Sequence, residues 1–113
     1  MPSDDALLLD MLQWCREGRS LVADVTWDHF QTERAIQLAV VYVLQTIGEA
    51  ARGISKATRN EHPEIPWDDI IGMRHRLVHE YGRVNLTIAW STVRSNVPDL
   101  IVMLESVVTW ENG

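Results

Sequence analysis

The residues of this chain best suited to chemistry lie together in one short segment. Two guanidinium groups, two imidazoles and a phenol occur in the run Arg74-His75-Arg76-Leu77-Val78-His79-Glu80-Tyr81. A guanidinium keeps its charge at any working pH, and its fork of donors matches phosphate oxygens. An imidazole can give and take a proton near neutrality. The segment therefore supplies a clamp for a phosphoryl group and a general acid or base, which together can cleave a phosphodiester without a metal ion.

The residues before this segment are typical of a helix start. Pro66 suits a first helical turn, and the acidic residues that follow Trp67 complement the positive end of the helix dipole. We therefore expect one helix that carries the motif and ends near Gly82. In such a helix Arg74 and His79 are separated by about 140° of rotation and about 7.5 Å of rise, so they do not share a face. This spacing favours a site shared by two copies of the helix across a two-fold axis.

The two imidazoles also raise the alternative of a metal site. His75 and His79 are four residues apart, and an H-x-x-x-H pair on a helix can bind zinc. No glutamate follows the first histidine, and no third ligand is evident beyond a conjectural Glu49. We therefore expect no metal and no cofactor, and we place His75 as a supporting residue that lines the phosphate site.

The elements that must position the motif are helices, because no segment alternates apolar and polar residues over a sustained length. The expected fold class is all-α, an antiparallel bundle of four to five helices. We predict a first helix ending near Gly18, a long helix from about Trp27 to Ile54, a loop over residues 55–65, the motif helix, and a fourth helix capped by Asn85. Pro98 should kink or restart this fourth helix, with Asn96 as a candidate cap.

The middle of the long helix indicates how the chain assembles. Residues 35–44 are apolar on nearly every side of the helix. A helix that is apolar all round is buried on all sides. In so small a protein this indicates a central position plus contact with a second copy, so we expect a two-fold homodimer.

Composition bounds the remaining possibilities. The 113 residues suffice for one domain, 1–113, with a core of its own, and the single cysteine, Cys15, fits a reducing cytosol. The longest apolar run, residues 38–44, is far shorter than the about 20 residues of a membrane span. We expect a cytoplasmic protein that does not enter a membrane. The formal charge of −6 argues against non-specific binding of nucleic acid, although three arginines and one acid between Arg74 and Arg83 form a small positive site.

The motif resembles the signature of a known family. Arg74-x-x-x-x-His79-x-Tyr81, preceded by Trp67 and Gly72-Met73, is similar to the signature of the HepT family, a branch of the HEPN ribonucleases. Further segments that match a long second helix, the entry to the catalytic helix and the start of the last helix are Ile47-Gly48-Glu49-Ala50-Ala51, His62-Pro63-Glu64-Ile65-Pro66-Trp67 and Asn96-Val97-Pro98-Asp99-Leu100. Gly82 departs from a position that is often aromatic, and His75 stands where asparagine is common.

The resemblance implies a HEPN-like fold and a specific function. HepT proteins are toxins of toxin–antitoxin pairs that cut RNA, mRNA or tRNA, as homodimers. Their partner MntA is a minimal nucleotidyltransferase that transfers AMP to the motif tyrosine and silences the toxin. Carried over to this chain, Arg74 and His79 are catalytic, and Tyr81 is the AMP acceptor. The alternative is a non-catalytic helical module that binds a minimal nucleotidyltransferase, because a retained motif does not prove turnover.

Glu49 and Arg76 are expected to support the catalytic pair. Glu49 lies in a mostly apolar segment, and a buried carboxylate needs a partner. Its side chain either faces solvent or forms an ion pair that holds Arg74 or Arg76 in place. The resemblance favours the ion pair.

Overall fold

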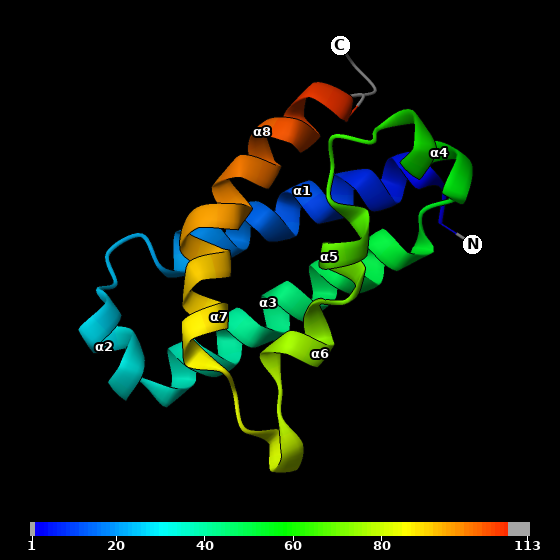
Figure 1. Ribbon diagram of the computed structural model, residues 1–113. Coiled ribbons are helices and arrows are strands. Elements are labelled where there is room, and N and C mark those ends of the chain that lie inside the picture. Colours follow the sequence, from blue (N-terminus) through cyan, green and yellow to red (C-terminus); the bar gives the residue numbers. More distant parts are fainter. Residues whose placement is uncertain (1, 109–113) are drawn as a thin grey trace.

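The chain folds into an all-α bundle in the computed structural model, which describes residues 2–108 apart from the side chain of Glu80 (Figure 1). The elements are α1 (Asp4–Leu21), α2 (Trp27–Thr32), α3 (Arg34–Gly53), α4 (Lys56–Glu61), α5 (Trp67–Ile71), α6 (Met73–Leu77), the 3-10 turn η1 (Glu80–Gly82), α7 (Leu86–Ser91), the π-helical turn η2 (Thr92–Asn96) and α8 (Val97–Val107). The described residues contain no strand, only one isolated antiparallel bridge between Val78 and Val84. The predicted fold class is confirmed.

The core lies along α1, which packs on both α3 and α8. Ser3 starts α1 because its side chain accepts a hydrogen bond from the Ala6 N–H at 3.1 Å. Met11, Leu12 and Cys15 of α1 are fully buried. Burial raises the pKa of the Cys15 thiol to about 12, so this thiol stays protonated and serves packing.

The first two predicted helices differ from the structure at their ends. The first continues past Gly18 to Leu21, because Gly18 lies inside the packing, where an added Cβ would be 3.1 Å from Val43 Cγ1. The long helix predicted from Trp27 is divided at Glu33, whose backbone is extended. The break leaves the Phe30 carbonyl without its helical donor, and the buried amide of Gln37 donates to it at 2.8 Å.

Residues 55–65, predicted as a loop, contain the short helix α4. Ser55 caps it by accepting from the Thr58 N–H. The Asp4 carboxylate, from the start of α1, accepts hydrogen bonds from the hydroxyls of Ser55 and Thr58, each at 2.6 Å, and from the Ser55 N–H. These bonds, that from the Ser55 hydroxyl first, lower the pKa of Asp4 below its ordinary value. A polar helix of this kind carries no apolar periodicity, so the sequence pattern did not reveal it.

The last helix continues through Pro98 instead of restarting there. The turn η2 before it is π-helical, and the Val97 N–H donates to the Thr92 carbonyl. Asn96 has helical backbone angles and makes no side-chain cap bond, so the candidate cap is wrong. The wider turn accommodates a proline that cannot donate its own backbone hydrogen bond. None of the helices in residues 2–108 is long and apolar enough to cross a membrane.

Candidate active site

The helices that carry the motif are held close against α3. An added Cβ on Gly48 of α3 would lie 2.9 Å from the backbone oxygen of Ile70 in α5. This distance is shorter than a carbon–oxygen contact normally allows, so the close approach requires a glycine. Met73 and Leu77 of α6 are buried in the same core. The backbone around the motif is therefore anchored on its inner side.

The single motif helix predicted to reach Gly82 is wrong in two places. Gly72 separates α5 from α6, and α6 ends at Leu77. Val78 is extended, with φ −122° and ψ 122°. The chain then turns back, and the Asn85 N–H donates to the Leu77 carbonyl at 2.8 Å. This bond takes the carbonyl that a continued helix would use for its own hydrogen bond.

His79 therefore lies outside any helix, while Arg74 lies on α6. The rotation and rise expected between the two residues in one helix therefore do not apply, and their spacing does not favour a site shared by two chains. His75 lies on α6 and His79 does not, so the two imidazoles do not share one face of a helix as expected. The part of the chain that the structure describes holds no group of three or more His, Cys, Asp or Glu side chains placed to bind a metal ion.

Residues 78–84 form a small hairpin, called here the motif loop, which projects from the bundle beyond α6 and α7 (Figure 1). The His79 N–H donates to the Arg83 carbonyl at 2.7 Å, and the Gly82 N–H donates to the His79 carbonyl at 3.2 Å. Tyr81 and Gly82 both have left-handed backbone, with φ of 62° and 73°. A tyrosine in this conformation is strained by about 1 kcal/mol. Gly82 suits its position because it has no Cβ.

Tyr81 stands at the tip of this loop with a side chain that is 95% exposed. Tyr81 therefore lies in a strained turn beyond the end of α6, and not within the helix predicted to end near Gly82. The left-handed backbone of Tyr81 and Gly82 forms the turn that carries the phenol away from the bundle. Its hydroxyl is therefore open to a second macromolecule.

Asn85 has a role that sequence reasoning identified only in part. The predicted cap is confirmed, since Asn85 Oδ1 accepts from the Ile88 N–H at 3.1 Å. The other atom of the same amide, Nδ2, lies 3.4 Å from His79 Nε2. No short-range motif signals this contact, because it depends on the loop folding back onto itself.

The side chains of Arg76 and Glu49, two of the expected supporting residues, make no hydrogen bond or ion pair with Arg74 or His79. Arg76 donates to the Asp69 carbonyl at 2.8 Å and contacts Met73 Sδ. Glu49 is exposed on α3 and forms no ion pair with Arg74 or Arg76, so the expected pairing is wrong in the single chain. Its carboxylate faces solvent instead.

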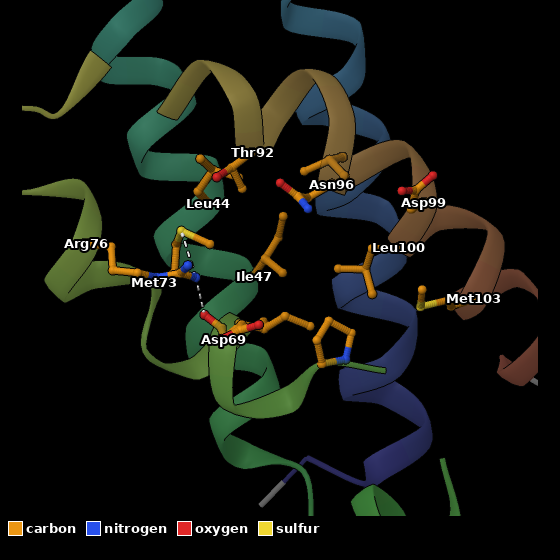
Figure 2. Close-up of a pocket in the computed structure, with 13 residues that line it drawn as sticks. Leu44, Ile47, Asp69, Met73, Arg76, Thr92, Asn96, Asp99, Leu100 and Met103 are labelled. Atoms are coloured by element: carbon orange, nitrogen blue, oxygen red, sulfur yellow. Dashed lines mark hydrogen bonds between the residues drawn. The ribbon is translucent and has the colours of Figure 1, made fainter. Parts of the chain in front are cut away.

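A cavity of about 180 Å³ lies between α3, the α5–α6 segment and the last helix (Figure 2). Figure 2 shows Arg76 reaching across toward Asp69, and the apolar residues Leu44, Ile47 and Leu100 also line the cavity. Neither Arg74 nor His79 lines this cavity. Phosphodiester backbones bind through exposed cations and donors and need no enclosed pocket, so the exposed motif is the candidate site.

The exposed pair can act on a phosphodiester. Arg74 and His79 are both exposed, and the guanidinium of Arg74 makes no ion pair or hydrogen bond with any residue that the structure describes. A free guanidinium can bind two phosphate oxygens, and the imidazole can transfer a proton. No hydrogen bond joins the two side chains within residues 2–108, so a substrate must bring them together.

Comparison with known proteins gives a consistent family. Residues 11–107 match the family described as "Ribonuclease HepT-like". The chain is 32% identical over 110 residues to "Putative RNase MJ0125" of Methanocaldococcus jannaschii, covering 96% of this chain and 95% of that protein. It is 33% identical over 101 residues to "Putative RNase TTE0752" of Caldanaerobacter subterraneus, covering 89% and 90%. It is 34% identical over 95 residues to "Probable ribonuclease HepT" of Thermococcus cleftensis, covering 80% and 86%.

No solved structure matched the chain at a significant level. The family match spans α3, the α5–α6 segment and the motif loop, which are the elements that build the candidate site. On this evidence the chain belongs to the HepT-like ribonuclease family.

Proposed function

We propose that the chain is an endoribonuclease that cuts RNA in the cytoplasm without a metal ion, with Arg74 and His79 as its catalytic residues. The observation that carries the proposal is the exposure of an unpaired guanidinium and an imidazole on either side of the end of α6. Family membership supports RNA as the substrate. His75, also exposed on α6, supports the phosphate site from the same helix.

The reaction is an internal transesterification. The 2′-oxygen of the substrate attacks the adjacent phosphorus and loses its proton to an imidazole acting as base. The bond from phosphorus to the 5′-oxygen breaks, and the leaving oxygen receives a proton from an imidazolium. The products are a 2′,3′-cyclic phosphate and a 5′-hydroxyl. Arg74 binds the phosphate oxygens and stabilises the charge that develops on them in the transition state.

The enzyme acts as a homodimer in this proposal. The outward face of α3 carries Leu38 and Tyr42, with exposed fractions of 48% and 61%. Large apolar side chains gathered on one helix face mark a contact surface. With two copies, His79 of one chain can serve as base and the same residue of its partner as acid.

The protein is the toxin of a toxin–antitoxin pair, and Tyr81 is its point of control. The Tyr81 oxygen would attack the α-phosphorus of ATP in a partner nucleotidyltransferase, losing its proton as pyrophosphate leaves. The new phosphate and adenosine would lie beside the exposed arginines Arg74 and Arg83. The phosphate can pair with these cations and occupy the space that RNA phosphate needs. The 95% exposure of Tyr81 supports this role.

Cleavage is tested with purified protein incubated with total RNA and with tRNA in EDTA. His79→Ala should lower the rate by roughly 10²–10⁴-fold, the usual contribution of a positioned acid or base. The matched control is His29→Ala, which removes an exposed imidazole on α2, outside the motif. Arg74→Lys should also cut poorly, because an ammonium cannot bind two oxygens in the same plane. Equal rates in all variants, or activity that needs added zinc, would refute the assignment.

Control by Tyr81 is tested by co-expression with a minimal nucleotidyltransferase, followed by intact-mass measurement. Wild-type protein should gain the mass of one adenylyl group per chain and lose RNA cleavage. Tyr81→Phe should gain no mass and stay active. Tyr42→Phe is the matched control, because Tyr42 is the other tyrosine of the chain. If the partner silences Tyr81→Phe without a mass change, inhibition occurs by binding alone.

A further inference from the structure

We propose that the cavity between α3, the α5–α6 segment and the last helix binds one unstacked base of the RNA substrate, and that it prefers a base with an exocyclic amine. The inference rests on the proposed function as a ribonuclease and adds base recognition to the phosphate site. The cavity measures about 180 Å³. Pockets for drug-sized ligands measure about 300–1,000 Å³, so this cavity suits a smaller group such as a single base.

Much of the cavity lining is apolar and suits a flat ring. Leu44 and Ile47 of α3 line it together with Leu100 of α8, and all three are buried. Two thioethers, those of Met73 and Met103, line it as well. Aliphatic side chains can pack against the faces of a base, and thioether sulfurs make favourable contacts with aromatic rings. These side chains offer contact area but do not distinguish one base from another.

Two polar side chains that line the cavity have no hydrogen-bond partner in the part of the chain that the structure describes. Thr92 is buried, with an exposed fraction of 7%, and its hydroxyl makes no hydrogen bond there. The Asn96 side chain makes none either, and Figure 2 shows its amide pointing into the cavity toward Ile47. Buried polar groups are normally hydrogen-bonded, so the unpaired hydroxyl indicates that a ligand supplies its partner. Both residues belong to the turn η2, and π-helical turns are frequent at functional sites.

The charged side chains that line the cavity favour hydrogen-bond donors over anions. They are the carboxylates of Asp69 and Asp99 and the guanidinium of Arg76, so their net charge is negative. Neither carboxylate forms an ion pair within the described residues, and Arg76 donates to the Asp69 carbonyl. Negative charge repels a phosphate, whereas a carboxylate or an amide oxygen accepts from the amine of cytosine, adenine or guanine. Uracil carries a carbonyl in place of this amine, so the cavity should discriminate against it.

The cavity and the Arg74 guanidinium lie on the two sides of α6. Met73 and Leu77 are buried in the core, and at about 100° per residue Arg74 and Arg76 leave the helix on opposite sides of this buried face. Arg76 lines the cavity, while Arg74 does not. The two sites are thus separated by about the width of a helix, roughly 10–12 Å. A single strand with splayed bases can cross this distance within a few nucleotides, so the bound base lies near the cleaved bond but not next to it.

The first test is methyl NMR with nucleosides, which needs no RNA cleavage. Cytidine and uridine are the matched probes, because they have the same size and differ in the exocyclic amine. Cytidine should shift the methyl signals of Leu44, Ile47 and Leu100 through the ring current of the bound base, whereas Val22, buried but not lining the cavity, should not move. Uridine should bind roughly tenfold more weakly. No shift at the lining methyls, or equal affinity for both nucleosides, overturns the inference.

Two variants test the unpaired polar groups. Thr92→Val keeps the shape of the side chain, and because the lost hydroxyl has no partner, this variant should melt at or above the wild-type temperature. Asn96→Ala should melt close to wild type, since Asn96 makes no cap bond. Both should lose cytidine affinity by roughly five- to tenfold, the usual contribution of one hydrogen bond.

The matched control for these variants is Ser95→Ala, which should bind cytidine as wild type does. Ser95 is exposed in the same turn and does not line the cavity. A Thr92→Val protein that melts below wild type and binds cytidine equally well would show that the hydroxyl serves the fold and not a ligand, which refutes the subsite.

The second test uses short single-stranded RNA and the variant His79→Ala, so that binding is measured without cleavage. Oligocytidine should shift the same methyl signals and bind more tightly than oligouridine, and adding Thr92→Val should remove this preference. Cytidine binding without methyl shifts from oligocytidine would assign the cavity to a free nucleoside and refute the RNA subsite. If the wild-type protein binds oligocytidine in the cavity but cuts no RNA, the proposed function fails and base recognition stands.

Discussion

Replacing Gly48 by alanine tests whether the close approach of α3 to α5 positions the motif. The new methyl carbon would lie 2.9 Å from the Ile70 carbonyl oxygen, whereas a relaxed carbon–oxygen contact is about 3.3–3.5 Å. The neighbour is backbone, so no side-chain rotation can relieve the clash. α5 must move outward by roughly 0.4–0.6 Å, which is the difference between these distances.

The effect on stability is the balance of two terms. Overpacking of this kind costs about 1–3 kcal/mol, and replacing a glycine inside a helix by alanine stabilises it by about 1 kcal/mol. The net change should be a loss of about 1 kcal/mol, which lowers the melting temperature by about 4 °C in a domain of this size. Because α5 continues through Gly72 into α6, the shift should displace Arg74 as well. A displacement of half an ångström should reduce RNA cleavage roughly tenfold, since about 1 Å can cost a hundredfold.

The assay is thermal melting with RNA cleavage, at one protein concentration. Gly53→Ala is the matched control on the same helix, because its new methyl would meet Leu7 Cδ1 at 3.0 Å. That atom ends a flexible side chain and can move, so Gly53→Ala should melt at or above the wild-type temperature. If Gly48→Ala melts as high as this control and cuts RNA at the wild-type rate, the close approach does not position the motif.

Three further outcomes follow from the structure. Gly82→Ala should lower the free energy of unfolding by about 1 kcal/mol in denaturant titration, because φ is +73° and open space around the site leaves backbone strain as the only cost; an unchanged value would contradict the left-handed turn. The hydrogen bonds that lower the pKa of Asp4 stabilise the fold at pH values above its ordinary pKa of 3.8, and this stabilisation is lost as the pH falls through the lowered pKa. The difference in melting temperature between wild type and Asp4→Asn should therefore shrink below pH 3.8; a constant difference would speak against these hydrogen bonds. The double variant Leu38→Glu/Tyr42→Glu should lower the mass measured by light scattering from that of a dimer, twice 12.9 kDa, to that of a single chain. A wild-type protein that is already monomeric would contradict a site shared by two chains.

Local patterns predicted the parts of the fold that depend on local forces. The all-α class followed from the spacing of apolar residues, and Asn85 was identified as a cap because capping involves only its own helix turn. The polar helix α4 was missed because it is held by Asp4, which is 51 residues away from Ser55. No periodicity within the segment reports such a partner.

The candidate site was predicted by residue type but not by geometry. The end of α6 at Leu77 depends on the bond from the Asn85 N–H and on the bridge between Val78 and Val84. These interactions form only after the chain has turned back, so helix propensity alone extends the helix too far. For the same reason the contact between Asn85 and His79 could not be anticipated. The ion pair expected for Glu49 does not form because Glu49 lies on the exposed side of α3, the alternative that its mostly apolar surroundings left open.

The central claim is that Arg74 and His79 cut RNA by internal transesterification, and the chemical ends of the products test it most directly. Purified protein is incubated with a defined RNA in EDTA, and the fragments are analysed by mass spectrometry. We predict fragments with a 2′,3′-cyclic phosphate and a 5′-hydroxyl from wild type and from His29→Ala, and intact RNA from His79→Ala. Fragments with a 5′-phosphate, or the same fragments in equal yield from His79→Ala, would contradict the account.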